Sequence, residues 1–423
     1  MTKTSLPPVQ NTGTPACSKA QFARKLGAQG RLVMRNVGLD LGVRHIAYCE
    51  IVDGKVIERV TVRSLRELRS RLGSDRPPAR VAFEACREGW HVYDLLESWG
   101  NEPWMVDTTR VRQIGVGHHS RKNDPIDAEA IAKALDADRL PIAHVLSPER
   151  RALRAQLSVR AALIETRAQY VTTIRGLARA VGVLLPSCAT GNFVPKLRAA
   201  AFDEATCVLI APLAKTLETI EVELVAVEKS LEDIANRDPI IQLCATAPGV
   251  GLIVAATFVS VIDEAHRFRN AHAVGAYLGL VPGEDSTGGK RRLGSITKQG
   301  NTWARVMLVQ AAWHILRLRD HDDALRLWGE HLAQTRGKKI AAVALARKLA
   351  GVLWAMWRDG TVYDSARQAE KSLRGVEASQ AYQRTREAAL KRAARKLERP
   401  AASSIEQPQS RPRKSTSEMN AMR

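Results

Sequence analysis

The chain has 423 residues and a formal net charge of +20, and its sequence pI is about 10.1. Hydrophobic residues make up 45% of it, so a buried core is expected, and the length allows two or three domains. A surplus of Lys and Arg on this scale favours a polyanionic partner, most commonly nucleic acid, although a basic tail or a solubility surplus gives the same totals.

Six single cysteines occur, and none forms a C-x-x-C pair or a zinc-type spacing with histidine. Scattered thiols of this kind fit a reducing compartment. The polar N-terminus lacks the apolar segment of a signal peptide, and the apolar stretch 251–262 is too short to span a bilayer. These features predict a cytoplasmic protein without a membrane partner.

Residues 1–34 are polar and read as a flexible leader. In residues 35–147, apolar runs between 37 and 62 predict three antiparallel strands, two of them joined by the tight turn Asp53–Gly54. Helices are then predicted at 64–73, 89–100 and 124–138, and strands at 80–85 and 102–107. This order predicts an α/β domain whose sheet has mixed strand directions.

Residues 148–239 have a helical pattern. An apolar stripe runs along 148–181, and a segment with Pro186, Gly191 and Pro195 reads as a loop. A heptad seam then predicts a coiled-coil helix; its residues are Leu213, Leu217, Ile220, Leu224, Val227, Leu231 and Ile234. The seam fits either the 148–181 helix of the same chain or a second subunit.

A second globular unit, mainly helical, is predicted for residues 240–365. It opens with "TAPGVG" and an apolar helix, and it continues through "GLVPGEDSTGGKRRLGSITKQGN". Residues 366–423 are rich in charge, Pro and Ser, which predicts a charged helix that runs into a disordered basic tail.

Four acids stand out in the first domain: Asp40, Glu84, Asp124 and Asp127. An acid inside an apolar strand is costly unless a cation or a hydrogen-bond donor meets it. The aspartates of "DPIDA" lie three residues apart and share a helix face. Hard oxygen ligands suit Mg²⁺ or Mn²⁺, so these acids predict a metal site. The alternatives are a helix N-cap, a favourable charge at the helix N-terminus and a solvated strand end.

The second unit holds candidate phosphate contacts. Gly249 and Gly251 predict a helix-hairpin-helix turn whose amides face a phosphate, with a simple tight turn as the alternative. The loop hydroxyls of Ser286 and Thr287 are followed by a basic segment. A phosphate clamp is predicted there, or else a solvated loop; its residues are Lys290, Arg291, Arg292, Lys298 and Arg305.

The motifs "GLDLG", "FEA" and "KNDPIDA" closely resemble the RNase H-like (RuvC-like) DEDD domain of the insertion-sequence family 110 transposases. The motifs "APGVGLIVAATFVS" and "AYLGLVPGEDSTGGKRRLGSITKQGN" resemble that family's C-terminal domain, in its 1111 subgroup. The resemblance covers about residues 36–360. It implies that the four acids hold Mg²⁺.

The resemblance also implies the reaction. A serine of the family's C-terminal domain attacks DNA and forms a covalent link, a structured RNA from the element guides the enzyme, and the enzyme is a homo-oligomer, here a dimer or tetramer. Counting from Pro282 without a gap places Thr287 at the serine position, and one gap places Ser286 there. Ser286 is favoured because a primary hydroxyl is less hindered than the β-branched one of threonine.

Two rival functions remain open from the sequence. One is a metal-dependent DEDD nuclease or Holliday-junction resolvase that uses only the first domain. The other is a nucleic-acid-binding protein without catalysis. A nuclease or resolvase that uses only the first domain would not need the second unit with its hydroxyl loop. A protein without catalysis would not need four acids at these positions.

Overall fold

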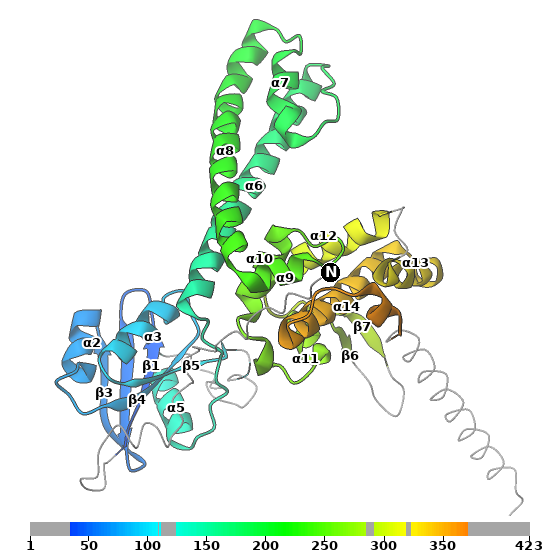
Figure 1. Ribbon diagram of the computed structural model, residues 1–423. Helices are drawn as coiled ribbons and strands as arrows, with labels where there is room; N and C mark the ends of the chain where they lie inside the picture. The colour runs from blue at the N-terminus through cyan, green and yellow to red at the C-terminus, as the bar shows by residue number, and fades with distance from the viewer. Residues whose placement is uncertain (1–33, 109, 111–123, 285–291, 319–322, 371–423) are drawn as a thin grey trace, which may run out of the picture. The chain divides into compact units, whose positions relative to one another are not determined.

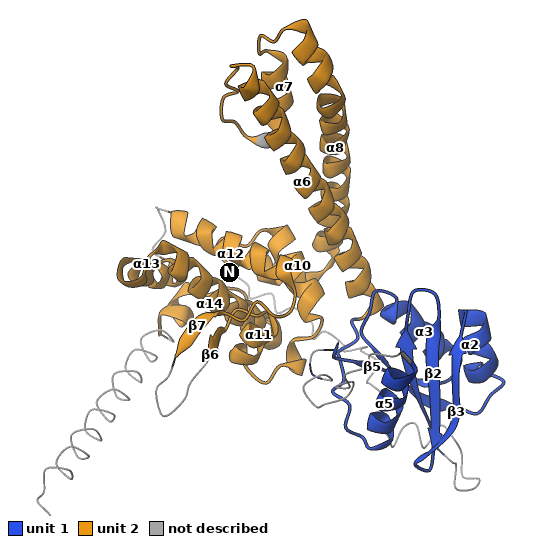
Figure 2. Cartoon of the chain, turned by 180° about the vertical axis from the view of Figure 1, so that it is seen from behind, with its two compact units in different colours: residues 1–146 blue, residues 147–423 orange. Residues whose placement is uncertain are grey.

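The computed structural model describes residues 34–108, 110, 124–284, 292–318 and 323–370 (Figure 1). The predicted leader and basic tail lie outside these residues, as do Ser286, Thr287, Lys290 and Arg291. The chain divides into two compact units, residues 1–146 and 147–423 (Figure 2). The predicted finer division at 148–239 and 240–365 stays a prediction.

The first unit is built on a five-stranded sheet in the order β3-β2-β1-β4-β5. Strands β1, β2 and β3 are antiparallel, whereas β1 pairs with β4 and β4 with β5 in parallel, which confirms the predicted mixed sheet. Asp53 and Gly54 have positive φ at the β2–β3 turn. The strands are β1 Arg35–Leu41, β2 Ile46–Val52, β3 Lys55–Val62, β4 Ala79–Glu84 and β5 Glu102–Val106.

Helices cover both faces of this sheet. On one face α2 (Leu65–Leu72) and α3 (Gly89–Ser98) pack on Leu39, Phe83 and their alternate neighbours. On the other face α5 (Asp124–Asp136) packs on Ala47 and Ala82. Because side chains alternate along a strand, each strand supplies apolar residues to both faces. The unit is therefore a three-layered α/β structure.

Gly38 lets α5 lie directly on β1. A Cβ atom at this position would lie 2.1 Å from the carbonyl oxygen of Ala128 and 2.6 Å from the amide nitrogen of Ala132. We therefore expect Gly38→Ala to push the helix off the strand and to destabilise the unit by about 1–3 kcal/mol, as overpacking does. Urea unfolding of the full-length protein measures this loss of stability. Gly54→Ala serves as a contrast, because its site is an open turn with positive φ, where a side chain strains the backbone but overpacks nothing. Equal stability of Gly38→Ala and the parent would contradict the packing.

The second unit begins with two long helices, α6 (Pro148–Ala180) and α8 (Glu204–Arg237), which pack as an antiparallel hairpin (Figure 1). Arg160 pairs with Glu228 and Arg167 with Glu221 across the hairpin. The heptad residues Leu217, Ile220, Leu224 and Leu231 are buried. Of the two partners that the sequence left open, the seam therefore takes the helix of its own chain.

The far end of this hairpin has its own small core. The segment predicted as a loop contains η1 (Thr190–Asn192) and α7 (Phe193–Arg198). Phe193 is buried against Ile174 and Ile210, and the guanidinium of Arg175 lies 5.1 Å from its ring centre. Pro195 does not prevent a helix because it falls in the first turn, where its missing N–H has no intrahelical partner to lose.

The remaining helices form the largest apolar core of the described residues, which α14 (Lys338–Asp359) crosses. By length and composition α14 alone among the described helices could cross a membrane, but 56% of its most apolar window is buried inside the protein. That burial is typical of a core helix. The other elements are α9 Pro239–Ala245, α10 Leu252–Ile262, η2 Ala265–Arg267, α11 Ala271–Tyr277, β6 Pro282–Glu284, β7 Leu293–Ile296, α12 Thr302–Arg317 and α13 Ala324–Arg336.

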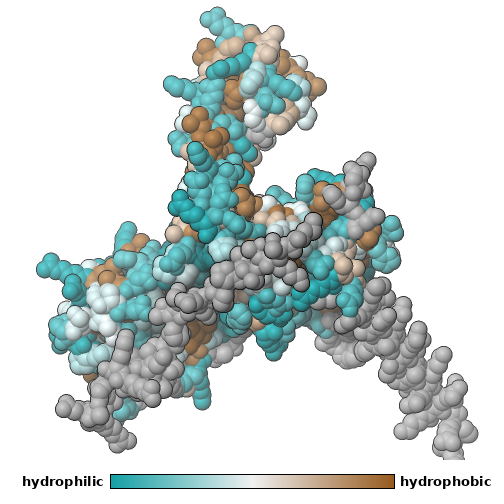
Figure 3. Space-filling model, in the orientation of Figure 1, coloured by the Kyte–Doolittle hydropathy of each residue, from teal (hydrophilic) through white to brown (hydrophobic). Residues whose placement is uncertain are grey.

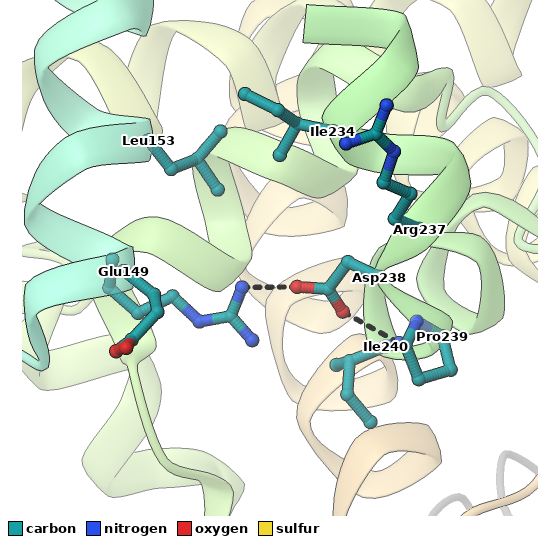
Figure 4. A pocket seen from close by; sticks show the side chains of 8 residues that line it. Glu149, Leu153, Ile234, Arg237, Asp238, Pro239 and Ile240 are labelled. Carbon is teal, nitrogen blue, oxygen red and sulfur yellow. Dashed lines mark hydrogen bonds and ion pairs between the residues drawn. The ribbon is translucent and has the colours of Figure 1, made fainter.

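Polar contacts tie the hairpin to this core (Figure 4). Asp238 ends α8 and caps α9, since its carboxylate accepts hydrogen bonds from the amides of Ile240 (2.9 Å) and Ile241. The same carboxylate forms an ion pair with Arg150 of α6. Ser147, which caps α6, donates its hydroxyl to Asp263 at 2.7 Å. Both helices of the hairpin are thus fixed at their base.

Candidate active site

Asp40 and Glu84 lie at the ends of neighbouring parallel strands. The β1–β4 register pairs Leu39 with Phe83, so the next residue of each strand is one of the two acids. Both side chains are half-buried. Parallel strands end at the same edge of a sheet. The fold therefore places these two carboxylates beside each other at the carboxyl edge of β1 and β4.

Both acids point to the face that α5 covers. Leu39 and Phe83 contribute to the core under α2 and α3. Because successive side chains alternate between faces, Asp40 and Glu84 point the opposite way. Ala82, two residues before Glu84, packs against Ile131 and Leu135 of α5, which agrees with this assignment.

The direction of α5 brings its first turn to the same edge. Asn36, early in β1, donates a hydrogen bond of 2.7 Å to Asp136 at the end of α5. Gly38 lies against Ala128 and Ala132, in the middle of the helix. The helix therefore runs antiparallel to β1, and its first turn reaches the level of Asp40.

Asp127 belongs to that first turn. It lies four residues before Ile131 and so shares a helix face with it. Ile131 packs on Ala82, two residues before Glu84. Half-buried Asp127 therefore lies one turn nearer the carboxyl edge, on the side of α5 that faces β4. Three of the four predicted acids come to one edge and one face of the sheet.

Asp124 begins α5, and Pro125 occupies its first turn as expected. The side chain of Asp124 lies outside the described residues. On a helix it shares a face with Asp127 three residues later. Whether it acts as a cap or as a ligand stays a prediction.

The donor chemistry of these acids suits a divalent cation, because carboxylate oxygens are the ligands that Mg²⁺ and Mn²⁺ prefer. Within the described part of the chain, however, no three His, Cys, Asp or Glu side chains are grouped closely enough to hold a metal ion as they stand. That statement leaves out Asp124. The structure thus shows at which edge and on which face of the sheet the acids lie. It does not show three described side chains close enough to one another to bind a metal ion.

Three of the described thiols, those of Cys49, Cys86 and Cys244, are unsuited to act as a competing nucleophile. Burial raises the pKa of the Cys244 thiol to about 12. It also raises the pKa values of Cys49 and Cys86. A thiol attacks as a thiolate, so these three groups are poor nucleophiles near neutral pH.

Gly249 and Gly251 lie in the turn between α9 and α10, two helices that contact each other. Gly249 has φ +71, and a Cβ atom there would lie 2.9 Å from the carbonyl oxygen of Ala311 in α12. Gly251 precedes α10 and faces open space. Close packing therefore accounts for Gly249, as the tight-turn alternative expects, while a phosphate contact at this turn stays a prediction.

Strands β6 and β7 pair antiparallel on either side of the predicted hydroxyl loop. Of the clamp residues in the described chain, Arg292 and Lys298 are exposed, as a phosphate contact requires. Arg305 differs, because it is only 9% exposed and donates hydrogen bonds to backbone carbonyls. Its geometry does not favour the predicted phosphate contact.

Gly38, which sets the distance between the acid-bearing elements β1 and α5, was not among the site residues predicted from the sequence. The signal was present, since an isolated glycine inside a strand pattern often marks a close backbone approach. It stands two residues before Asp40 in "GLDLG".

A mixed sheet with acids at one edge, joined to a basic helical unit, is an architecture suited to an enzyme that processes nucleic acid. Residues 37–181 match a transposase family of the DEDD type, IS110, and residues 241–326 match the family described as "Transposase IS116/IS110/IS902 family". The chain belongs to this family of transposases, a class of enzymes that cut and rejoin DNA. The family membership that the resemblance implied is thereby confirmed.

Relatives extend the match over most of the chain. The chain is 30% identical over 294 residues to a probable family 20 transposase of Pseudomonas aeruginosa, and the match covers 68% of this chain and 86% of the relative. It is 29% identical to the transposase for insertion sequence element IS1111A of Coxiella burnetii, over 65% of this chain and 77% of the relative. The transposase for element IS1328 of Yersinia enterocolitica is 28% identical, over 77% and 98%.

Proposed function

We propose that this transposase cuts and rejoins DNA through a hydroxyl nucleophile of residues 285–291, with a divalent cation held by the acids of the first unit. The observation that carries the proposal is the convergence of Asp40, Glu84 and Asp127 on one edge and one face of the sheet. Carboxylates so placed can share a divalent cation, whose charge would offset their mutual repulsion.

Each part of the chain has a role in this reaction. Ser286, or Thr287 in its place, attacks a phosphorus atom of DNA, and the bond from that phosphorus to a deoxyribose oxygen breaks. The hydroxyl proton passes to a base, and the leaving oxygen gains a proton. A divalent cation, Mg²⁺ or Mn²⁺, supplies charge neutralisation at the phosphoryl oxygens when it is bound. The phosphoserine bond conserves the energy needed to rejoin strands without ATP.

The fold restrains the elements that carry the acids. Strand pairing fixes Asp40 and Glu84, and the close approach at Gly38 fixes α5 on β1. Restraints of this kind would lower the cost of bringing the acids together around a cation.

DNA is the substrate, and we propose that an element-encoded structured RNA selects it in the cytoplasm. Base pairing would then supply the sequence specificity, while Arg292 and Lys298, together with Lys290 and Arg291, hold phosphates. Such a division of labour accounts for a net charge of +20.

We also propose a homo-oligomer, a dimer or tetramer. The heptad seam is occupied by α6, so a contact between subunits needs another surface. Apolar patches appear at the far end of the hairpin (Figure 3), where Leu184 is 77% and Val208 is 69% exposed. Large exposed apolar patches are typical of interaction sites, so this end is the candidate contact.

Deleting residues 371–423 is expected to weaken DNA binding without removing the chemistry, because the tail is rich in Lys and Arg, its charges are unpatterned, and its end is rich in Pro, Ser and Arg. The slope of log Kd against log salt should become shallower, since fewer counterions are released on binding. Fluorescence anisotropy at several salt concentrations measures both quantities. Loss of the folded state on deletion would show instead that the tail packs on the core.

A denaturing gel tests the proposal against its rivals. The purified protein is incubated with labelled DNA carrying the element ends, with and without Mg²⁺ and co-purified RNA. A recombinase gives a protein–DNA adduct that survives detergent and disappears with protease. A DEDD nuclease or a junction resolvase gives free cut ends without an adduct, and a non-catalytic binding protein leaves the DNA intact.

A further inference from the structure

The chain segments that flank β6 and β7 meet backbone to backbone. A Cβ atom at Gly279 would lie 2.1 Å from the carbonyl oxygen of Gln299, and one at Gly300 would lie 2.1 Å from that of Tyr277. Both glycines have positive φ, +68 and +73. Side chains would both clash and strain the backbone here, so the two glycines permit this crossing.

Hydrogen bonds hold the two segments together. The amide of Lys298 donates to the carbonyl of Gly279 at 3.1 Å, and the amide of Thr297 donates to that of Val281 at 2.9 Å. Lys298 itself has φ +56, which is uncommon for a residue with a side chain. The base of the β6–β7 hairpin is thus a defined structure with strained backbone, and strain of this kind persists only where the surroundings impose it.

Arg305, in the first turn of α12, lies under this crossing. Its Nη1 donates to the carbonyls of Leu278 (3.2 Å), Gln299 (2.5 Å) and Gly300 (3.2 Å). Its Nη2 donates to the hydroxyl of Thr302 at 3.0 Å. One buried guanidinium therefore connects the segment before β6, the segment after β7 and the helix below them.

We infer that Arg305 is a positioning residue: it fixes the base of the β6–β7 hairpin on α12, and through it the direction in which the hairpin presents its loop to DNA. This inference rests on the proposed function, in which that loop carries the nucleophile. Arg305 is suited to the task because a guanidinium offers five donors in a rigid plane, whereas a lysine ammonium offers three at one point.

The effect on the reaction should be large because in-line attack needs close alignment, and a misplacement of about 1 Å costs on the order of 10²-fold in rate. The effect on DNA affinity should be small, because the donors of Arg305 are directed at backbone carbonyls. A phosphate contact predicts the reverse, with weaker binding and a salt slope reduced by about one.

The test compares three full-length variants. Arg305→Met removes the donors, and Arg305→Lys keeps the charge. Arg76→Met is the control, because Arg76 also donates to a backbone carbonyl, that of Ser70 (3.0 Å), but in the first unit and before β4. For each variant, anisotropy gives the Kd for DNA, and single-turnover reactions at saturating DNA give the rate of adduct formation.

We expect Arg305→Met to slow adduct formation by about 10²-fold or more with its Kd changed by less than about threefold. Arg305→Lys should fall in between, and Arg76→Met should keep the parent rate. Hydrogen exchange should show that the amides of Thr297 and Lys298 are less protected in Arg305→Met. If Arg305→Met does not fold, the Arg305→Lys rate and exchange decide.

An unchanged rate at saturation in Arg305→Met would overturn the inference while leaving the proposed function intact. Weaker binding with an unchanged rate would assign Arg305 to a phosphate instead. If the parent protein forms no adduct at all, the proposed function fails, and the inference fails with it.

Discussion

Replacing Asp40 by alanine is expected to lower DNA cutting and rejoining by about 10³-fold or more, because charge stabilisation by a bound cation contributes several kcal/mol to phosphoryl transfer. Glu84→Ala and Asp127→Ala should have effects of the same size, since the three side chains share one edge and one face of the sheet. Double variants should be no worse than single ones, because groups that act as a unit are not additive.

Folding and DNA binding should survive these changes. All three acids are half-buried rather than part of the apolar core. Asp94→Ala is the matched control, because Asp94 is an exposed acid on α3, which covers the opposite face of the same sheet. Circular dichroism and DNA affinity should match the parent in every variant. If Asp124→Ala recombined DNA at the parent rate, Asp124 would be assigned to a helix cap alone.

The second large effect concerns the nucleophile. Ser286→Ala is expected to abolish the covalent protein–DNA adduct, and Thr287→Ala should retain part of it. The reason is steric, because attack on phosphorus requires close approach and a primary hydroxyl is less hindered than a β-branched one. Trapping the adduct on nicked DNA and mapping the modified peptide by mass spectrometry identifies the residue directly.

The same experiment contains its own control. Both variants keep the β6–β7 strands and the exposed Arg292 and Lys298, so their DNA affinity should equal that of the parent. A modified Thr287 in the parent protein would reverse the assignment, and it would support the alignment counted from Pro282 without a gap.

Local patterns in the first unit predicted its sheet because each depends on near neighbours. Alternating apolar residues gave the three antiparallel strands, and Asp53–Gly54 gave their turn. The helix predicted at 64–73 is α2, and the hydroxyl of Ser64 caps it by accepting a hydrogen bond from the amide of Glu67. The carboxylate pair of "DPIDA" was predicted at the start of a helix, where α5 begins.

The partner of the heptad seam could not be predicted, since the same apolar spacing fits a helix of the same chain or of another. The structure pairs α8 with α6, with ion pairs such as Arg160–Glu228. The pattern fixes which face of α8 is buried, but the partner depends on where the chain turns at α7.

The role of Arg305 was also beyond the sequence. In "KRRLGSITKQGNTWAR" it looks like one more basic residue among several. Its partners lie 5, 6 and 27 residues away, and it meets them only because the segments before β6 and after β7 cross. Burial that results from long-range contacts leaves no pattern in the local sequence. Lys298 and Arg305 therefore look alike in the sequence, although Lys298 is exposed and Arg305 is buried in the structure.

Manganese binding tests most directly whether the acids form one centre. The full-length protein is titrated with Mn²⁺, and free ion is measured by electron paramagnetic resonance, which does not depend on activity. We predict that the parent binds Mn²⁺ and that Asp40→Ala, Glu84→Ala and Asp127→Ala each weaken this binding by at least about tenfold, while Asp94→Ala binds like the parent. Equal Mn²⁺ binding by the parent and all three acid variants would contradict the account.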